Sequence, residues 1–295
     1  MAAPTPPTLT DIVTEGLKKA GNTTPTSAQI TRASTYWMEE IKNDIWIRAK
    51  RLKSLHVTAH GMLTKGKSRN ALPDDYSSEL SLTLLDGTAT GIAQAATAST
   101  ITLAAGTDLQ ADSVIGKEIL ITSCTGVGSL SQAVSYDNTT KISGVVPDLT
   151  TTPDATSGYM IVSDYNLLRG PLMIGNLDRL SNPTTLGRPS AFSMMGDEDS
   201  GEFILDCAPS KIYGARLRYY ANLMKLDLAG TLMATLYQNW REVFLSGLKW
   251  KGLEDDDDNR QIEVRNEYRR VLRNLVAQET YGHDMSNLQI AVVDY

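Results

Sequence analysis

The feature that most constrains this chain is an abrupt change in composition at Asp86-Gly87. Residues 87–165 contain no Arg, Trp, Phe or His and are rich in Thr, Ser, Ala and Gly. Short runs of β-favouring residues recur in this segment, at 100–103, 117–122, 130–136, 140–146 and 158–163. Turn signals such as Asp137-Asn138 separate them. Several short strands at this spacing predict a small barrel or sandwich, so we expect 87–165 to be an inserted all-β domain.

Helical patterns flank the predicted insert. Residues 9–20 have apolar positions at helical spacing, and Thr8 is placed to cap that helix. The apolar stripe of 26–55 predicts one helix of roughly 40 Å. Residues 228–250 predict a third helix, and the acidic run 254–258 is expected to open a last one, where carboxylates complement the helix dipole.

Three segments alternate between apolar and polar residues, at 79–85, 203–207 and 215–219. Such alternation is typical of half-buried strands, and we expect all three in one sheet. The predicted fold class is therefore α+β: a helical bundle with a small β-sheet, plus the inserted all-β domain. We assign 1–86 and 166–280 to the bundle and its sheet.

Gly282 is the predicted stop signal of the last helix, and residues 281–295 form a predicted docking tail. Its apolar residues are Leu288, Ile290, Val292, Val293 and Tyr295. A solvated end is usually polar, so this composition predicts a partner. Adding a strand to the edge of another sheet is one way to bind it, and packing back on its own domain is the alternative.

The charge of the chain is acidic and unevenly spread. The formal net charge is −6. Residues 87–165 hold seven acids and two lysines, so they contribute −5 and the remaining residues −1. This balance argues against a general nucleic-acid binder.

One stretch is nevertheless basic and contains no acid. It comprises Arg48, Lys50, Arg51, Lys53, Lys65, Lys67 and Arg69. Contact with DNA phosphates is one interpretation, and a solvated helix end is another. The third is pairing with the acidic run of a neighbouring copy, through Asp255, Asp256, Asp257 and Asp258.

No pattern of catalytic, metal-binding or cofactor-binding residues is found in the sequence. His56 and His60 are four residues apart, but Gly61 and the β-favouring Val57-Thr58 argue against a helix that would align them. Two cysteines cannot supply a disulfide framework. There is no phosphate-binding loop and no nucleophile elbow. We therefore expect no enzyme activity, no bound metal and no cofactor.

The order of the flanking parts resembles a known family. The residues that carry the resemblance are Leu72-Pro-Asp-Asp-Tyr76, Tyr213-Gly-Ala-Arg-Leu-Arg-Tyr-Tyr220, Leu236-Tyr-Gln-Asn-Trp240, Phe244-Leu-Ser-Gly-Leu248, Asp256-Asp-Asp-Asn-Arg260 and Tyr268. A Trp-bearing helix, a Gly turn, an acidic helix start and a Tyr in the last helix recur in the head–tail adaptor, or connector, proteins of tailed phages, the tail tubular protein A family. The resemblance covers roughly 8–86 and 166–280.

The predicted insert carries a separate resemblance. Residues 116–128, Val134-Ser-Tyr136-Asp and Pro153–Tyr159 are similar to a small β module found in phage head–tail and tail-fibre proteins, which usually has Gly where Cys124 stands. That module is structural or a docking surface. Its presence in an adaptor is not general, so the resemblance leaves the role of the insert open.

The family resemblance implies a virion structural protein at the head–tail junction, assembled in the host cytoplasm. About twelve copies would form a ring that joins the portal to the tail and surrounds the DNA exit channel. The implied partners are the portal protein, the tail nozzle or tube protein, further copies of the chain, tail fibres through the insert, and the genome DNA in the lumen. The tail 281–295 would then dock on the portal. The alternative is a fibre-attachment or baseplate protein whose insert holds fibres or host glycans, and a cell-wall hydrolase is a third class.

Overall fold

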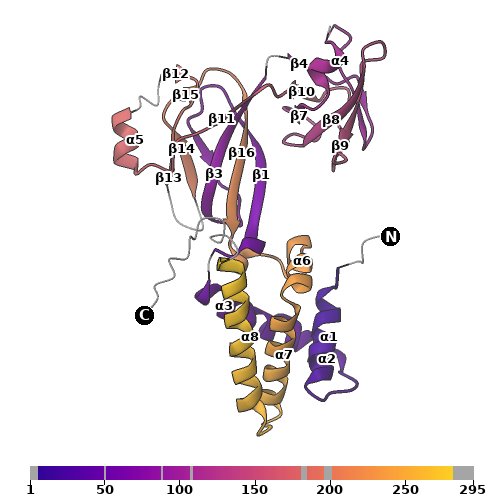
Figure 1. Ribbon diagram of the computed structural model, residues 1–295, viewed down its shortest axis with the longest axis vertical. Helices are drawn as coiled ribbons and strands as arrows, with labels where there is room; N and C mark the ends of the chain where they lie inside the picture. Colours follow the sequence, from indigo (N-terminus) through magenta and orange to yellow (C-terminus); the bar gives the residue numbers. More distant parts are fainter. Residues whose placement is uncertain are drawn as a thin grey trace, which may run out of the picture. The chain divides into compact units, whose positions relative to one another are not determined.

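The computed structural model describes residues 6–49, 51–87, 89–106, 109–180, 185–195 and 201–281. The chain divides into two compact units (Figure 1). The helical unit comprises Met1–Val57, Asp75–Ser78 and Tyr220–Tyr295, and the β unit comprises Thr58–Asp74 and Glu79–Tyr219. Within the described ranges, no helix is long and apolar enough to cross a membrane.

The helical unit is built from segments at both ends of the sequence. Its helices are α1 (Leu9–Lys19), α2 (Ser27–Arg32), α3 (Met38–Arg48), α6 (Thr231–Asn239), α7 (Arg241–Asp255) and α8 (Gln261–Tyr281). A π-helical turn, Ala33–Trp37, joins α2 to α3. The expected Thr8 cap is confirmed, because Thr8 and Asp11 form a reciprocal capping box. Thr26 and Gln29 do the same at the start of α2.

Two helix boundaries differ from the prediction. The helix expected to reach residue 55 ends at Arg48, where Ala49 adopts an extended backbone. The apolar pattern continues because Leu52 and Leu55 are still buried, but they lie at a 3-10 turn, Lys53–Leu55. Apolar residues at helical spacing thus stay buried here although the backbone is no longer helical.

The acidic run was also placed on the wrong element. Glu254 and Asp255 end α7, and α8 begins only at Gln261. Asp258 accepts a hydrogen bond from the backbone N of Arg260, so it forms part of the turn before α8. The helix expected over 228–250 is likewise two helices, with Trp240 between them.

The core of the helical unit depends on one close helix contact. A Cβ on Gly16 of α1 would lie 2.5 Å from the Cβ of Leu248 on α7, so only glycine fits. Around this contact, Tyr237 packs edge-on against Phe244 at 5.1 Å between ring centroids. Trp240 stacks beside the same ring at 6.4 Å. These aromatic residues are buried in the helical unit.

The β unit contains several sheets. The strand order of a four-stranded sheet is β1-β16-β3-β11 and that of a three-stranded sheet is β13-β14-β2, beside a short parallel pair β12-β15. Their bounds are β1 His56–Leu63, β2 Arg69–Ala71, β3 Tyr76–Asp86, β11 Asp164–Leu167, β12 Leu186–Gly187, β13 Phe192–Met195, β14 Glu202–Leu205, β15 Ala208–Pro209 and β16 Tyr213–Ala221. A short helix, α5 (Ile174–Leu180), precedes β12.

A seven-stranded sheet occupies the segment between β3 and β11, in the order β4-β10-β7-β8-β9-β6-β5. Its strands are β4 Ala89–Ile92, β5 Ala95–Ala96, β6 Thr100–Thr102, β7 Glu118–Ile121, β8 Leu130–Asp137, β9 Ile142–Val146 and β10 Gly158–Ile161, with a short helix α4 (Ala111–Val114) before β7. All its pairs are antiparallel. A domain boundary at 87–165 stays a prediction, because the compact units are divided elsewhere.

The predicted fold class needs correction. A helical bundle with one small sheet was expected outside 87–165, but that part also holds three antiparallel or parallel sheets, so the protein is mixed α+β and not a helical bundle. The strand β16 does join β3 in one sheet, as predicted. The strand β14 does not, because it pairs with β13 and β2. Alternation identified the strands but could not choose their partners.

Candidate interaction surfaces

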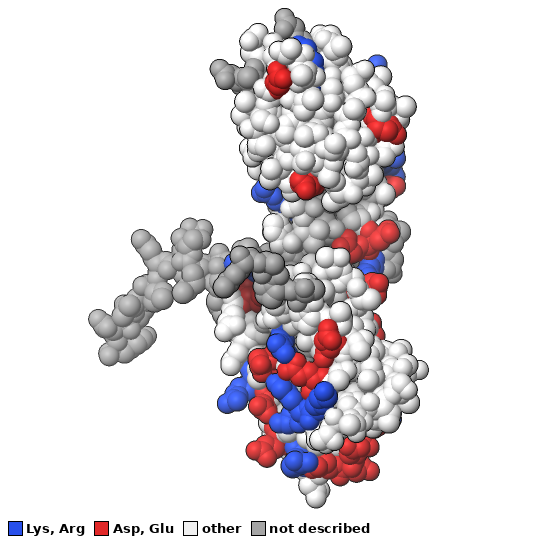
Figure 2. Space-filling view, turned by 90° about the vertical axis from the view of Figure 1, so that its right-hand side faces the viewer, with Lys and Arg blue, Asp and Glu red and all other residues white. Residues whose placement is uncertain are grey.

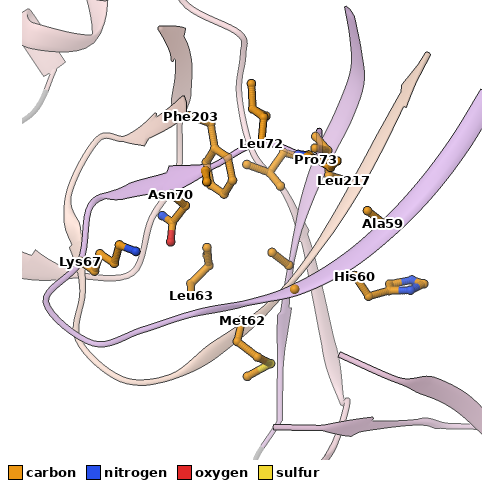
Figure 3. Close-up of a pocket in the computed structure, with 14 residues that line it drawn as sticks. Ala59, His60, Met62, Leu63, Lys67, Asn70, Leu72, Pro73, Phe203 and Leu217 are labelled. Atoms are coloured by element: carbon orange, nitrogen blue, oxygen red, sulfur yellow. The ribbon is translucent and has the colours of Figure 1, made fainter. Parts of the chain in front are cut away.

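An apolar cavity of about 380 Å³ lies within the β unit (Figure 3). Residues of β1, β2, β3, β14 and β16 line it. Leu63 and Phe203 extend into the space, while the ring of His60 points away from it. Strand alternation explains this, because neighbouring residues of β1 face opposite sides of the sheet. Gly61 is on the cavity side, and a Cβ built on it meets no atom within 4 Å.

The polar residues at the cavity do not form a catalytic set. Asn70 extends from the edge strand β2 toward Leu63 (Figure 3). Its Nδ2 is buried without a hydrogen-bond partner. Lys67 is the cationic residue of the lining. A nucleophile needs an adjacent base, and the lining supplies neither a carboxylate nor a hydroxyl.

The opposite face of the same sheet holds an ion pair. Arg216 on β16 pairs with Glu118 of β7, and Tyr165 donates a hydrogen bond of 3.0 Å to the same carboxylate. Burial and the Glu118 charge raise the pKa of Tyr165 to about 12. Burial and the nearby Arg216 lower the pKa of His60. Among the described residues, no group of three or more His, Cys, Asp or Glu side chains is placed to hold a metal ion.

The basic stretch is divided between the two compact units. Arg48, Arg51 and Lys53 belong to the helical unit, whereas Lys65, Lys67 and Arg69 belong to the β unit. Lys50 lies outside the described residues. Arg48 is paired with Asp44 at 3.2 Å and Arg69 with Glu202 at 3.8 Å. Arg51, Lys53, Lys65 and Lys67 are exposed.

Three acids of the run 254–258 form ion pairs within their own chain, and the first of these pairs joins Glu254 to Lys251 at 3.0 Å. Asp255 pairs with Arg32 at 2.7 Å, and Asp258 pairs with Arg260 at 2.7 Å. Hydrogen bonds from Arg260 hold the pKa of Asp258 at about 2, well below its ordinary 3.8. In the described part of the chain, Asp256 and Asp257 make no ion pair and are exposed.

Sequence reasoning missed a row of arginines on α8. Arg265, Arg269, Arg270 and Arg273 are all exposed. The guanidinium of Arg265 lies over the ring of Trp250, 5.3 Å from its centroid. The spacing of 265, 269 and 273 was a usable signal, because residues four apart share one helical face. The apolar residues on the opposite face of α8 follow a helical spacing as well, and that buried face alone was predicted from the sequence.

A groove of about 200 Å³ lies between α3, α7 and α8. Its acids already have partners: Asp44 binds Arg48 at 3.2 Å, and Glu40 binds Lys251 at 2.6 Å. Arg269 lines the same groove without an ion pair in the described ranges. On the face seen in Figure 2, charged side chains crowd the helical unit and are sparse over the β unit.

The predicted docking tail cannot be placed. Leu288, Ile290, Val292, Val293 and Tyr295 lie outside the described residues, and so does everything after Tyr281. In comparisons with known proteins, no family model matches the chain and no curated protein matches it.

Proposed function

We propose that this chain is a structural subunit of a phage head–tail junction, which forms a ring that joins the portal to the tail around the DNA exit channel. The order of sequence motifs over 8–86 and 166–280 supports this. The cavity and the ion-paired face lack a catalytic set, which favours a binding or structural role over a hydrolase.

The observation that carries the proposal is the exposed face of α3. Tyr36, in the turn before α3, is 65% exposed, and Ile47 near its end is 70% exposed. Glu40 and Asn43 lie between them and are exposed as well. Tyrosine is enriched in protein interfaces, and apolar side chains with a charged surround are typical of an interface core with a polar rim.

A ring is tested by measuring native mass. We expect the purified wild-type protein to form a closed oligomer of about twelve copies, and Tyr36→Ser with Ile47→Ser to yield a monomer with an unchanged melting temperature, because neither side chain is buried. Met173→Ser is the matched control, since Met173 is 80% exposed on the β unit. A wild-type monomer at every concentration would reject the proposal, and a trimer would favour a fibre-type protein.

The cavity of the β unit supports a second candidate, a fibre-attachment module. Its lining is largely apolar, and the space beside Gly61 is empty, so the cavity could accept an apolar side chain of a partner. Gly61→Val would place a branched side chain in the cavity at a position where the new Cβ meets no atom within 4 Å, so we expect it to abolish fibre binding in a pull-down while leaving folding intact. Gly175→Val is the control, because a Cβ there also meets no atom within 4 Å and lies away from the cavity. Normal binding by Gly61→Val would reject this candidate.

A further inference from the structure

The arginines of α8 carry more positive charge than their surroundings balance. Arg265, Arg269 and Arg273 are successive residues on one helical face, and like charges four apart destabilise an isolated helix. The Nε of Arg273 donates to the backbone O of Arg269 at 3.3 Å, and no carboxylate within the described ranges pairs with either side chain. The acids of the adjoining groove are engaged by Arg48 and Lys251. An exposed cationic row without local compensation is suited to an anionic partner.

The turn between α7 and α8 presents the complementary charge. Asp256 and Asp257 are exposed there, and no ion pair engages them within the described part of the chain. The turn has a defined conformation, because Asp257 has a φ of 49° and the backbone N of Asp258 donates to the O of Leu253 at 3.0 Å. Ion pairs at Asp255 and Asp258 hold both ends of the turn. The turn therefore presents the exposed carboxylates of Asp256 and Asp257 on a backbone of defined conformation.

The two features cannot neutralise each other within one chain. Asp257 lies in the turn before α8, and Arg269 lies eight residues beyond the first residue of that helix, Gln261, which at 1.5 Å per residue is roughly 12 Å along the axis. That distance exceeds the Debye length of about 8 Å at physiological salt, so the attraction within one chain is largely screened. A second copy can bring the acidic turn to the arginines directly.

We propose that Asp256 and Asp257 of one copy dock against Arg269, Arg270 and Arg273 of the next. This contact rests on the proposed ring, and it names the two different surfaces that a heterologous interface requires. The exposed Ile262 lies between them on α8, 69% exposed, and supplies an apolar contact near the centre. The partner is a second copy rather than DNA because the complementary acids are present in the same chain, whose net charge is −6.

The contact is tested by exchanging the charges. One variant carries Arg269→Glu with Arg273→Glu, and the other carries Asp256→Lys with Asp257→Asn, since asparagine tolerates a positive φ. Each alone places like charges together, so the concentration at half-assembly should rise on the order of 100-fold. An equimolar mixture of the two, and a chain that carries all four substitutions, should both assemble again. Lys18→Glu with Lys117→Glu is the control and should assemble normally.

Native mass and circular dichroism distinguish the outcomes. If the wild type forms rings and both double variants assemble as well as it does, the contact is wrong. The contact is also wrong if the chain with all four substitutions folds but stays monomeric. Neither result bears on the proposed ring itself. A wild-type protein that never assembles would overturn the proposed function together with the contact. Intact rings that lose only DNA retention in the arginine variant would assign the arginines to phosphate binding instead.

Discussion

The indole Nε1 of Trp240 donates a hydrogen bond of 3.2 Å to the carboxylate of Glu279. The same carboxylate accepts bonds from the backbone N of Ser54 at 2.8 Å and from its Oγ at 2.6 Å. A single side chain near the end of α8 thereby ties the segment after α3 to the turn between α6 and α7. All three residues belong to the helical unit.

Removing this carboxylate should destabilise the helical unit. Glu279→Ala leaves the buried indole N–H and the Ser54 N–H without an acceptor, and we expect the free energy of unfolding to fall by about 2–3 kcal/mol. Gln278→Ala is the control, because Gln278 is exposed and should shift stability by less than about 0.5 kcal/mol. Denaturant unfolding measures both. Equal effects would mean that the hydrogen bonds of Glu279 to Trp240 and Ser54 do not contribute to stability.

Gly16→Ala should also destabilise, against the helix propensity of alanine. In an exposed helix this change would stabilise by about 1 kcal/mol. Here the new Cβ would lie 2.5 Å from the Cβ of Leu248, so α1 must move from α7, at an expected cost of about 1–3 kcal/mol. Gly61→Ala meets no atom within 4 Å and should leave stability unchanged. A stabilised Gly16→Ala variant would show that the two helices are not in contact.

Lys42 is expected to be required for its hydrogen bonds and not only for its charge. Its side chain is 1% exposed, and its Nζ donates to the backbone O of Leu226 at 2.9 Å and to Glu39 at 3.1 Å. Lys42→Met keeps the volume but leaves the Leu226 carbonyl unpaired, at about 1–3 kcal/mol. Lys42→Ala should cost more, because it also leaves a cavity. Thermal unfolding in which alanine is tolerated better than methionine would contradict this order.

The Asp154 cluster should make the β unit sensitive to acid. Hydrogen bonds from Thr125, Thr156 and Ser157 hold the pKa of Asp154 far below its ordinary 3.8. Because the folded-state pKa is depressed, this contribution to stability is present above about pH 4 and is lost as the pH falls toward the folded value. The stability difference between wild type and Asp154→Asn should therefore be full at pH 6 and shrink below pH 4. A difference independent of pH would exclude a titrating carboxylate.

Local signals in the sequence predicted local structure well. The Thr8–Asp11 and Thr26–Gln29 spacings specify helix starts because the hydrogen bonds involved span only three residues. The end of α3 at Arg48 was missed because Leu52 remains buried after the helix stops. An apolar pattern reports burial, and burial persists where the backbone changes.

Strand partners and the candidate surfaces depend on distant residues. The strand β14 alternates like β16 but pairs with β13 and β2, which no property of 203–207 alone could indicate. The cavity at Gly61 is formed by five separate strands and leaves no linear pattern. The acidic run was recognised as a charge feature, whereas its position in a turn follows from α7 extending through Asp255.

The packing of α1 against α7 also means that α1 is synthesised well before the helix that covers it. Gly16 leaves the ribosome long before Leu248, and the whole of the β unit, Thr58–Asp74 and Glu79–Tyr219, is made between them. At roughly 5–20 residues per second, α1 must wait for more than about ten seconds before its partner exists. During that interval its apolar face is uncovered, so nascent chains of this protein should depend on a chaperone that shields α1 until α7 emerges.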